Sequence, residues 1–158
     1  MSVLHVNLDL GDTLSVLEHL ADSRAQQAVV NAAAESYIDD TLDFIKSVHA
    51  FKANTGALEQ SIGWHGIGNG KAEVYANADY ATYVEEGTGI YAGHSEWDVV
   101  AKNRKALKIT IAGGGFVLHR KAHHKGAKPH PFFFADKDNR EQHMQERGLL
   151  VLARFING

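Results

Sequence analysis

The N-terminal segment alternates apolar and polar residues. Leucine or valine stands at every second position of residues 4–10, which is the period of a strand with one buried face. Gly11 interrupts this pattern, and the side chain of Asp12 or Thr13 can accept the first free amides of a helix. We therefore predict a strand followed by a short helix that reaches Leu20.

A helical period begins next. From about Asp22 to Phe51, apolar residues recur at steps of three and four positions, while Glu35, Asp39 and Asp43 lie off this stripe. About 30 residues with a rise of about 1.5 Å each make a rod of about 45 Å. We predict a long helix as the main element of the fold. Its apolar stripe consists of Val30, Ala34, Tyr37, Ile38, Leu42, Ile45 and Val48.

A first hairpin follows the long helix. Residues 61–67 and 71–77 are strand-like and are joined by Gly68-Asn69-Gly70, residue types that reach positive φ at little cost. One face of this hairpin is expected to hold Ile62, Trp64, Val74 and Ala76.

A second hairpin is predicted further along the chain. Residues 106–112 and 116–120 are joined by Gly113-Gly114-Gly115, which we interpret as a turn. This glycine run lacks the following Lys-Ser/Thr of a phosphate-binding loop. A buried row of this hairpin is expected to consist of Leu107, Ile109, Ile111, Phe116 and Leu118.

The remaining segments are short helices and connections. We predict a helical turn at residues 55–60 capped by Asn54 or Thr55, a helix-like stretch at 79–86, and a mixed loop at 87–105. The C-terminal residues 136–156 read as a helix whose apolar side holds Met144, Gly148, Val151, Leu152 and Phe155. The predicted fold class is α+β, with an antiparallel sheet of two hairpins plus an N-terminal strand, packed by the long helix and the C-terminal helix. One domain is expected to span residues 1–158.

Composition narrows the class of protein. The chain has 158 residues, 44% apolar and 22% charged, which is typical of a soluble domain with its own core. Its formal net charge of −3 gives no bulk attraction to nucleic acid or to anionic membranes. The absence of cysteine excludes thiolate chemistry, disulfides and cysteine-ligated zinc. We expect neither a secretory signal nor a membrane span, since no basic N-terminal region precedes an apolar run and no stretch of about 18 apolar residues exists.

A histidine-rich segment is the main candidate for chemistry. His119, His123, His124 and His130 stand among the cations Arg120, Lys121, Lys125 and Lys128. One interpretation is a metal or phosphate site, and the other is a solvated basic loop that meets an acidic neighbour or DNA. The nearby cations disfavour a divalent ion, so the solvated loop is preferred.

Other polar groups show no catalytic pattern. The adjacent acids Glu85 and Glu86 point in different directions on a helix, which favours a solvated face, although one of them can hold a turn amide or a basic partner. Trp97 either anchors a partner or folds its own loop. We therefore predict no catalytic residue, no metal ligand and no cofactor.

Three spaced motifs carry a resemblance to a known family. They comprise Thr55-Gly56, Leu58 and Ser61-Ile62, then Tyr80-Ala81, Val84-Glu85 and Gly87-Thr88, then Pro131-Phe132 with Ala135. In this order they resemble the gene-product-ten-like tail-component family of tailed bacteriophages, whose members are described as tail-completion or head–tail joining proteins. The chain lacks two prolines that the family often has, one before Thr55 and one before Ala135.

The resemblance implies a structural, non-enzymatic virion protein of a long-tailed phage. It implies a homo-oligomeric ring, sixfold like the tail, that completes the tail and joins it to the head after assembly in the host bacterial cytoplasm. The implied partners are further copies of the chain, neighbouring neck and tail proteins and DNA passing through the channel, with no membrane. A tail-terminator or head-closure ring is the alternative in the same class. Alternatives from other classes are a small metal-binding enzyme using the His119–His130 loop and a nucleic-acid-binding accessory protein.

Motif positions and two connections are the candidate interfaces. The connections are residues 87–105 and the hairpin tip at residues 113–115, because long polar connections in a small domain are usually functional. The candidate residues are Thr55, Gly56, Leu58, Ser61, Tyr80, Ala81, Glu85, Gly87, Thr88, Trp97, Pro131 and Phe132.

Overall fold

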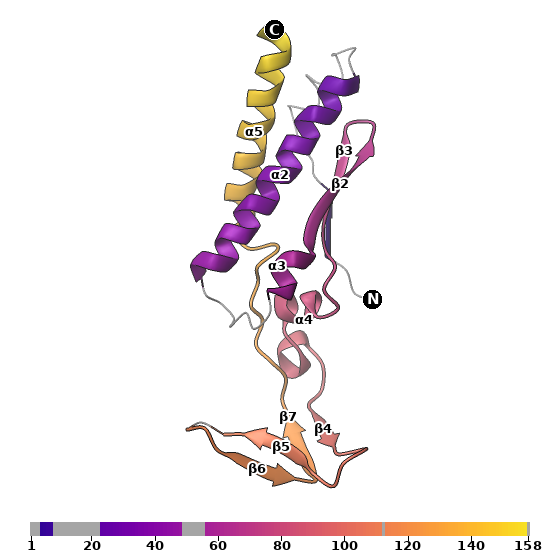
Figure 1. The fold of residues 1–158 in the computed structure, drawn as a ribbon, viewed down its shortest axis with the longest axis vertical. Helices are drawn as coiled ribbons and strands as arrows, with labels where there is room; N and C mark the ends of the chain where they lie inside the picture. Colours follow the sequence, from indigo (N-terminus) through magenta and orange to yellow (C-terminus); the bar gives the residue numbers. More distant parts are fainter. Residues whose placement is uncertain (1–3, 8–22, 49–55, 112, 158) are drawn as a thin grey trace. The chain divides into compact units, whose positions relative to one another are not determined.

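The computed structural model describes residues 4–7, 23–48, 56–111 and 113–157 (Figure 1). The chain divides into two compact units, which are described separately. Unit 1 consists of Met1–Glu85 and Pro131–Gly158, and unit 2 consists of Glu86–His130. The prediction of one domain over residues 1–158 stays a prediction.

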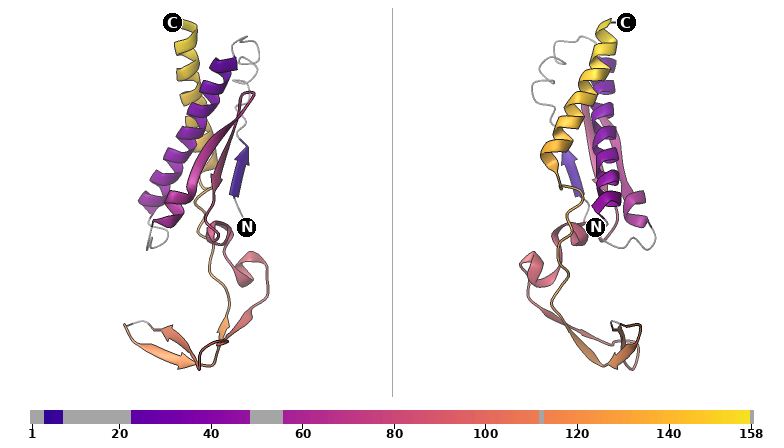
Figure 2. Two further views of the ribbon diagram at one scale, coloured as in Figure 1. Left: turned by 45° about the vertical axis from the view of Figure 1, so that its right-hand side comes forward. Right: turned by 90° about the vertical axis from the view of Figure 1, so that its left-hand side faces the viewer.

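Helix α2, Ser23–Val48, is the longest element of unit 1. It contains neither glycine nor proline, so its backbone hydrogen bonding continues over the whole segment. The helix contacts strands β2 and β3 as well as helix α5, and Figure 2 shows it beside both. The predicted long helix is confirmed, and its extension to Phe51 lies outside the described residues.

The sheet of unit 1 has three antiparallel strands in the order β1-β3-β2. Its strands are β1 Leu4–Asn7, β2 Ile62–Gly68 and β3 Lys71–Ala76. Ile62 is opposite Ala76 and Trp64 is opposite Val74, so the predicted shared face is confirmed. The predicted continuation of the first strand to Leu10 and the short helix at residues 13–20 lie outside the described residues.

Helix α5, Lys137–Asn157, packs along α2. Met144, Gly148 and Leu152 are buried, as the apolar stripe predicts, but Phe155 is 48% exposed. A Cβ on Gly148 would lie 3.2 Å from Cγ1 of Val29, so the absence of a side chain lets the two helices approach closely. The apolar side of α5 is therefore buried at Met144, Gly148 and Leu152 and is open to solvent at Phe155.

Two short helices complete unit 1. Helix α3, Ala57–Ser61, begins after Gly56, which is its N-cap with φ 65° and makes no side-chain cap bond. The predicted cap at Asn54 or Thr55 falls on residues outside the described part of the chain. Helix α4, Ala81–Glu86, confirms the predicted helix-like stretch at the end of this unit.

Unit 2 contains a 3₁₀ turn and two separate strand pairs. The turn η1 spans Gly89–Ala92. One pair consists of β4 Trp97–Val100 and β7 Lys121–His124, and the other of β5 Leu107–Thr110 and β6 Phe116–His119. The α+β class is confirmed, but the second hairpin forms its own two-stranded sheet instead of joining the first.

The buried row predicted for the second hairpin is wrong in part. Leu107 and Ile109 are half-buried, whereas Ile111, Phe116 and Leu118 are 47%, 54% and 62% exposed. The register explains the difference, because Ile109 is opposite Val117, and Phe116 and Leu118 lie on the other face with Lys108 and Thr110.

Candidate assembly surfaces

Glu85 is a buried carboxylate at the end of α4, with 7% of its surface exposed. Its Oε2 accepts the backbone N–H groups of Phe132 and Phe133 at 2.8 and 2.9 Å, and its Oε1 accepts that of Phe134 at 3.1 Å. A buried charge needs such partners, because its loss of hydration is otherwise unfavourable. The solvated reading is wrong for Glu85, and the alternative that one of the two acids holds turn amides is confirmed.

Arg140 of α5 holds the opposite side of the same segment. Its guanidinium donates to the carbonyls of Phe133 and Phe132 at 2.7 and 3.0 Å and to the hydroxyl of Thr41 at 2.9 Å. The Tyr37 hydroxyl donates to the Phe133 carbonyl at 2.6 Å, and burial raises the pKa of Tyr37. A carboxylate and a guanidinium thus bind the amides and carbonyls of neighbouring peptide units. We call Glu85, Arg140 and Phe132–Phe134 the clamp.

The clamp explains why two of the three motifs belong together. Glu85 comes from the second motif and Phe132 from the third, and the hydrogen bonds join them across 47 positions. Phe132 and Phe133 are fully buried, whereas Pro131 and Phe134 are exposed. Because low-dielectric surroundings strengthen these bonds, the clamp sets where the chain enters α5. No sequence signal marked Arg140 as part of it.

The first motif has a local structural role. Leu58 is 3% exposed and belongs to the core. The Ser61 hydroxyl donates to the Leu58 carbonyl at 2.7 Å, at the point where α3 gives way to β2. The left-handed φ of Gly56 suits glycine.

The second motif divides between the two units. In unit 1, Ala81 is fully buried and Tyr80 is 43% exposed. In unit 2, the Thr88 amide donates to the Ala127 carbonyl at 2.9 Å and the Ala127 amide donates to the Thr88 hydroxyl at 2.8 Å. Gly87 has φ 78°, and a Cβ there would lie 2.7 Å from the Ala127 carbonyl oxygen. Gly87 and Thr88 therefore hold two chain segments of unit 2 together.

Strands β4 and β7 replace the loops that the sequence predicted. Trp97 stacks on His124 with ring centroids 4.8 Å apart and is still 41% exposed. Lys121 and Asp98 form an ion pair at 2.8 Å. Trp97 therefore packs on its own unit, and the interpretation that it anchors a partner stays a prediction.

The histidine-rich segment pairs with acids. His123 contacts Glu96 through Nε2 at 2.5 Å and Asp98 through Nδ1 at 3.2 Å. Hydrogen bonding to Glu96, and then to Asp98, raises the pKa of His123, while the hydrogen bond from Lys121 lowers the pKa of Asp98. Within the described residues, no three His, Asp or Glu side chains are grouped to hold a metal ion.

Unit 2 has almost no core of its own. Among its described residues, the buried ones are Gly87 and Gly89, and every larger side chain is half-buried or exposed. Its exposed large apolar side chains are Ile90, Tyr91, Trp97, Val99, Val100, Ile111, Phe116 and Leu118. Both sheets have only two strands, so each strand has an unpaired edge within the described residues. Such surfaces are typical of a segment that packs against another protein.

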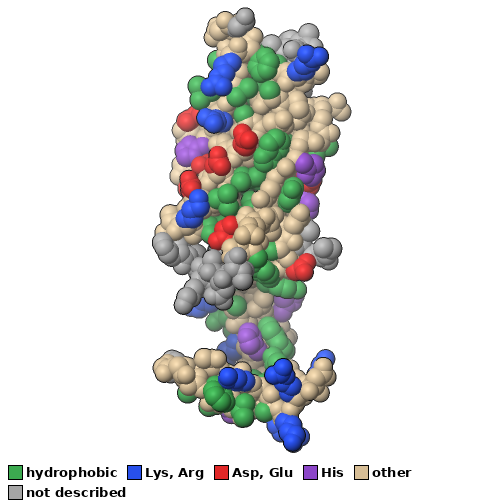
Figure 3. Space-filling model, viewed as in Figure 1, with side chains coloured by type: hydrophobic (Ala, Val, Ile, Leu, Met, Phe, Trp, Pro, Cys, Tyr) green, Lys and Arg blue, Asp and Glu red, His purple; other side chains and the backbone are tan. Residues whose placement is uncertain are grey.

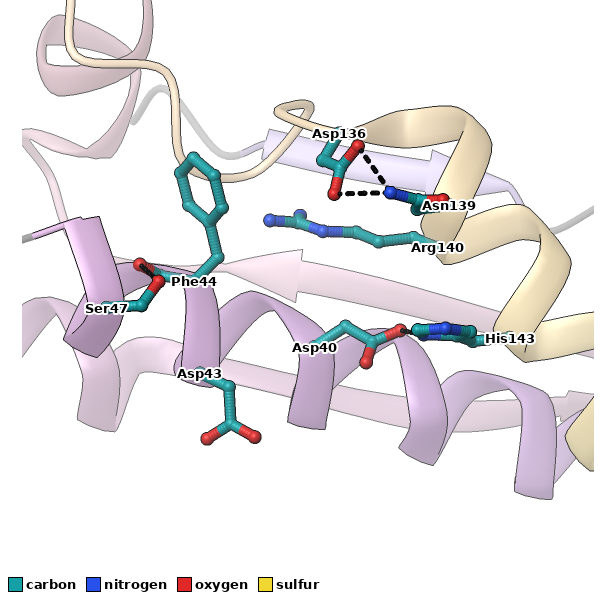
Figure 4. A pocket seen from close by; sticks show the side chains of 8 residues that line it. All are labelled: Asp40, Asp43, Phe44, Ser47, Asp136, Asn139, Arg140 and His143. Atoms are coloured by element: carbon teal, nitrogen blue, oxygen red, sulfur yellow. Dashed lines mark hydrogen bonds and ion pairs between the residues drawn. The ribbon is translucent and has the colours of Figure 1, made fainter.

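Unit 1 also contains a pocket of about 360 Å³ between α2 and α5 (Figure 4). His143 contacts Asp40 at 3.0 Å, and Asn139 donates to both carboxylate oxygens of Asp136 at 3.0 and 3.1 Å. The polar side chains that line this pocket are thus hydrogen-bonded largely to one another. The lining residues are Asp40, Asp43, Phe44, Ser47, Asp136, Asn139, Arg140 and His143.

Comparison with known protein families defines the class of this protein as a bacteriophage tail component. Residues 9–87, half of the chain, match the family described as "Bacteriophage HK97-gp10, putative tail-component". The chain belongs to this HK97 gp10-like family, which confirms the resemblance inferred from the motifs. The match contains the first motif and the second as far as Gly87, and it ends before Thr88 and Pro131.

Family membership points to assembly rather than catalysis. As a tail component, the protein is a structural part of the virion and interacts with other tail proteins. Searches of the curated proteins and of the solved structures return no match. None of the described helices is both long and apolar enough to cross a membrane.

Proposed function

We propose that this protein forms a homo-oligomeric ring at the neck or top of a long phage tail, where it completes the tail and joins it to the head. The tail-component family supports this role. The observation that carries it is unit 2, which has almost no core and exposes eight large apolar side chains, five of them on its two-stranded sheets. Two-stranded sheets are marginal in water, so a neighbouring subunit that covers them would stabilise them.

A ring follows from the kind of contact that these surfaces allow. Head-to-tail contacts join two different surfaces and close into a ring when the rotation per subunit divides a full turn. Unit 2 supplies one surface and a second, different surface on the next subunit supplies the other. Sixfold symmetry would match the tail. Shape and packing then suffice, without any reaction step.

The experiment removes apolar area from unit 2. The double variant Phe116→Ser with Leu118→Ser changes two side chains that are 54% and 62% exposed. We expect it to fold, to lose ring formation in solution, and to leave heads and tails unattached when it replaces the wild-type protein during infection. Ile67→Ser is the control, because Ile67 is 56% exposed on strand β2 of unit 1.

Two outcomes would contradict the proposal. One is normal yield of infectious particles from the double variant, with the protein still incorporated. The other is wild-type protein that stays monomeric at every concentration and is not found at the neck or tail top by electron microscopy of labelled particles. Label at the head side alone would favour the head-closure alternative.

A further inference from the structure

The formal charge of the chain is divided unequally between its units. Unit 2, residues 86–130, has eight Lys and Arg against three Asp and Glu, which gives +5. Unit 1 has eight Lys and Arg against sixteen Asp and Glu, which gives −8. The small total of −3 therefore hides two strongly charged parts. On the face shown in Figure 3, acidic side chains gather over the helices, and the charged side chains over the strands of unit 2 are Lys and Arg.

Helix α2 presents a row of carboxylates on its outward face. Glu35, Asp39 and Asp43 follow one another at four-residue steps, and all three are exposed. The row spans about 12 Å at the helical rise of about 1.5 Å per residue. Asp43 pairs with Lys46 at 3.1 Å, an exposed pair, and in the described part of the chain neither Glu35 nor Asp39 has an ion-pair partner.

Unit 2 presents a matching row of cations between β4 and β5. Lys102, Arg104 and Lys105 are exposed, and none of them forms an ion pair with a described residue. Residues 102–106 form a run of bends, so the three cations lie within one short exposed segment whose charge is opposite to that of the carboxylate row. The segment lies inside residues 87–105, one of the two connections that the sequence marks as an interface.

We infer that residues 102–105 of one copy dock on the Glu35–Asp43 row of the next copy, so that opposite charges set the head-to-tail direction of the ring. This inference rests on the proposed ring. Charge complementarity selects orientation and partner more than it adds affinity. The exposed apolar side chains of unit 2 supply the buried area, and the charged rows exclude contacts between two like units.

The test uses charge-reversed full-length chains. The acidic-row variant carries Glu35→Lys, Asp39→Lys and Asp43→Lys, and the basic-row variant carries Lys102→Glu, Arg104→Glu and Lys105→Glu. Each alone should need about tenfold more protein for half assembly, because three pairs become repulsive. Mixed in equal amounts, the two variants should recover assembly, since an alternating sixfold ring restores every contact. The control is Asp79→Lys with Asp138→Lys, which reverses two exposed acids outside α2.

The outcomes separate the inference from the proposed function. If wild-type rings form and both variants assemble as well as wild type, the inference fails and the ring stands. If wild-type protein forms no ring at low salt, both fail. If one chain carrying all six changes recovers assembly but the mixture does not, the contact is within a chain and the inference is wrong.

A nucleic-acid role for the cations is tested in the same samples. Fluorescent duplex DNA is added to wild type and to the basic-row variant at low and high salt. Loss of DNA binding without loss of assembly would overturn the inference in favour of a DNA contact. Neutral versions of both variants, with Gln or Asn at the same positions, give a second measurement if a reversed chain fails to fold, and they should show a smaller change in the same direction.

Discussion

The two units differ in the interactions that stabilise them. Unit 1 buries large side chains, including Tyr37, Phe132, Phe133 and Met144, around a clamp of two buried charges. Unit 2 buries only glycines among its described residues and relies on backbone bonds such as Thr88 to Ala127. Unit 1 has the features of a self-sufficient domain, whereas unit 2 has the features of a segment that another molecule completes.

This contrast indicates which unit is suited to contacts with neighbouring proteins. A well-packed core tolerates little change, because removed atoms leave cavities or unpaired groups. Exposed strands and glycine turns are less stable alone, but they can gain much from a partner. A tail component needs both, a rigid body that keeps its shape and an adaptable part that contacts its neighbours.

The largest expected effect comes from the clamp. Glu85→Ala leaves three amides without their acceptor, so we expect the free energy of unfolding to fall by about 3–5 kcal/mol, at about 1–3 kcal/mol for each unsatisfied buried group. Chemical denaturation of the purified protein measures this change. Glu86→Ala is the matched control, because Glu86 is the exposed neighbour. Equal losses from the two variants would refute the clamp.

A smaller, local effect is expected in unit 2 from Gly126→Ala. Gly126 has φ 111°, and a Cβ there would lie 1.8 Å from the Thr88 carbonyl oxygen, so the chain must move. We expect a loss of at least about 2 kcal/mol, seen as faster hydrogen exchange in β4 and β7 but not in α2. Gly113→Ala is the control, since Gly113 has φ 99° but no atom within 4 Å of its Cβ position, and about 1 kcal/mol of backbone strain is expected. Uniform exchange changes in both units would contradict the division.

The same substitution in the two units gives a direct comparison. The Thr41 hydroxyl donates to the Tyr37 carbonyl at 2.7 Å and accepts from Arg140, so Thr41→Val should lower the unfolding free energy by about 1–2 kcal/mol. Thr110→Val alters an exposed position of β5 and should change the free energy of unfolding by less than about 0.5 kcal/mol. Thermal unfolding of both variants tests the difference, and a reversed order would refute it.

The smallest expected effect is the pH response of His123. Hydrogen bonds to Glu96 and Asp98 raise the pKa of His123 in the folded protein. The contribution of these bonds to the free energy of unfolding is therefore fully present below about pH 6.5, the pKa of the unfolded state, and is lost as pH rises through the folded pKa. Nuclear magnetic resonance titration of the imidazole should give a midpoint above 6.5 in wild type and a lower one in Glu96→Gln. An unchanged midpoint in Glu96→Gln would show that the contact is not formed in solution.

Sequence patterns predicted the elements whose signal is local. The apolar period of α2, the Gly68–Gly70 turn and the stripe of α5 each lie within one segment, so neighbouring residues suffice to reveal them. The motifs likewise predicted the family, because they are read directly from residue order. Glu85 and Phe132 were found by their motifs, although Arg140 and the hydrogen bonds of the clamp were not.

Sequence patterns failed where a segment distant in the sequence determines whether a residue is buried or which strand it pairs with. The alternation in Phe116 and Leu118 indicates a strand, but a buried face requires a second layer. Their face has the Lys108 ammonium over the Phe116 ring, and both side chains stay more than half exposed. Strand β7, with the sequence Lys-Ala-His-His, has too little apolar character to predict a strand, and it pairs with β4 more than twenty positions away.

By itself, the sequence of this protein determined the period of each helix, the position of its turns and its membership of a tail-component family. The tertiary structure decided which charges are buried, because Arg140 meets Thr41 across 99 positions and Glu85 meets Phe132 across 47. Burial of a charge depends on partners that converge only when the chain is folded, since each isolated group is better solvated by water.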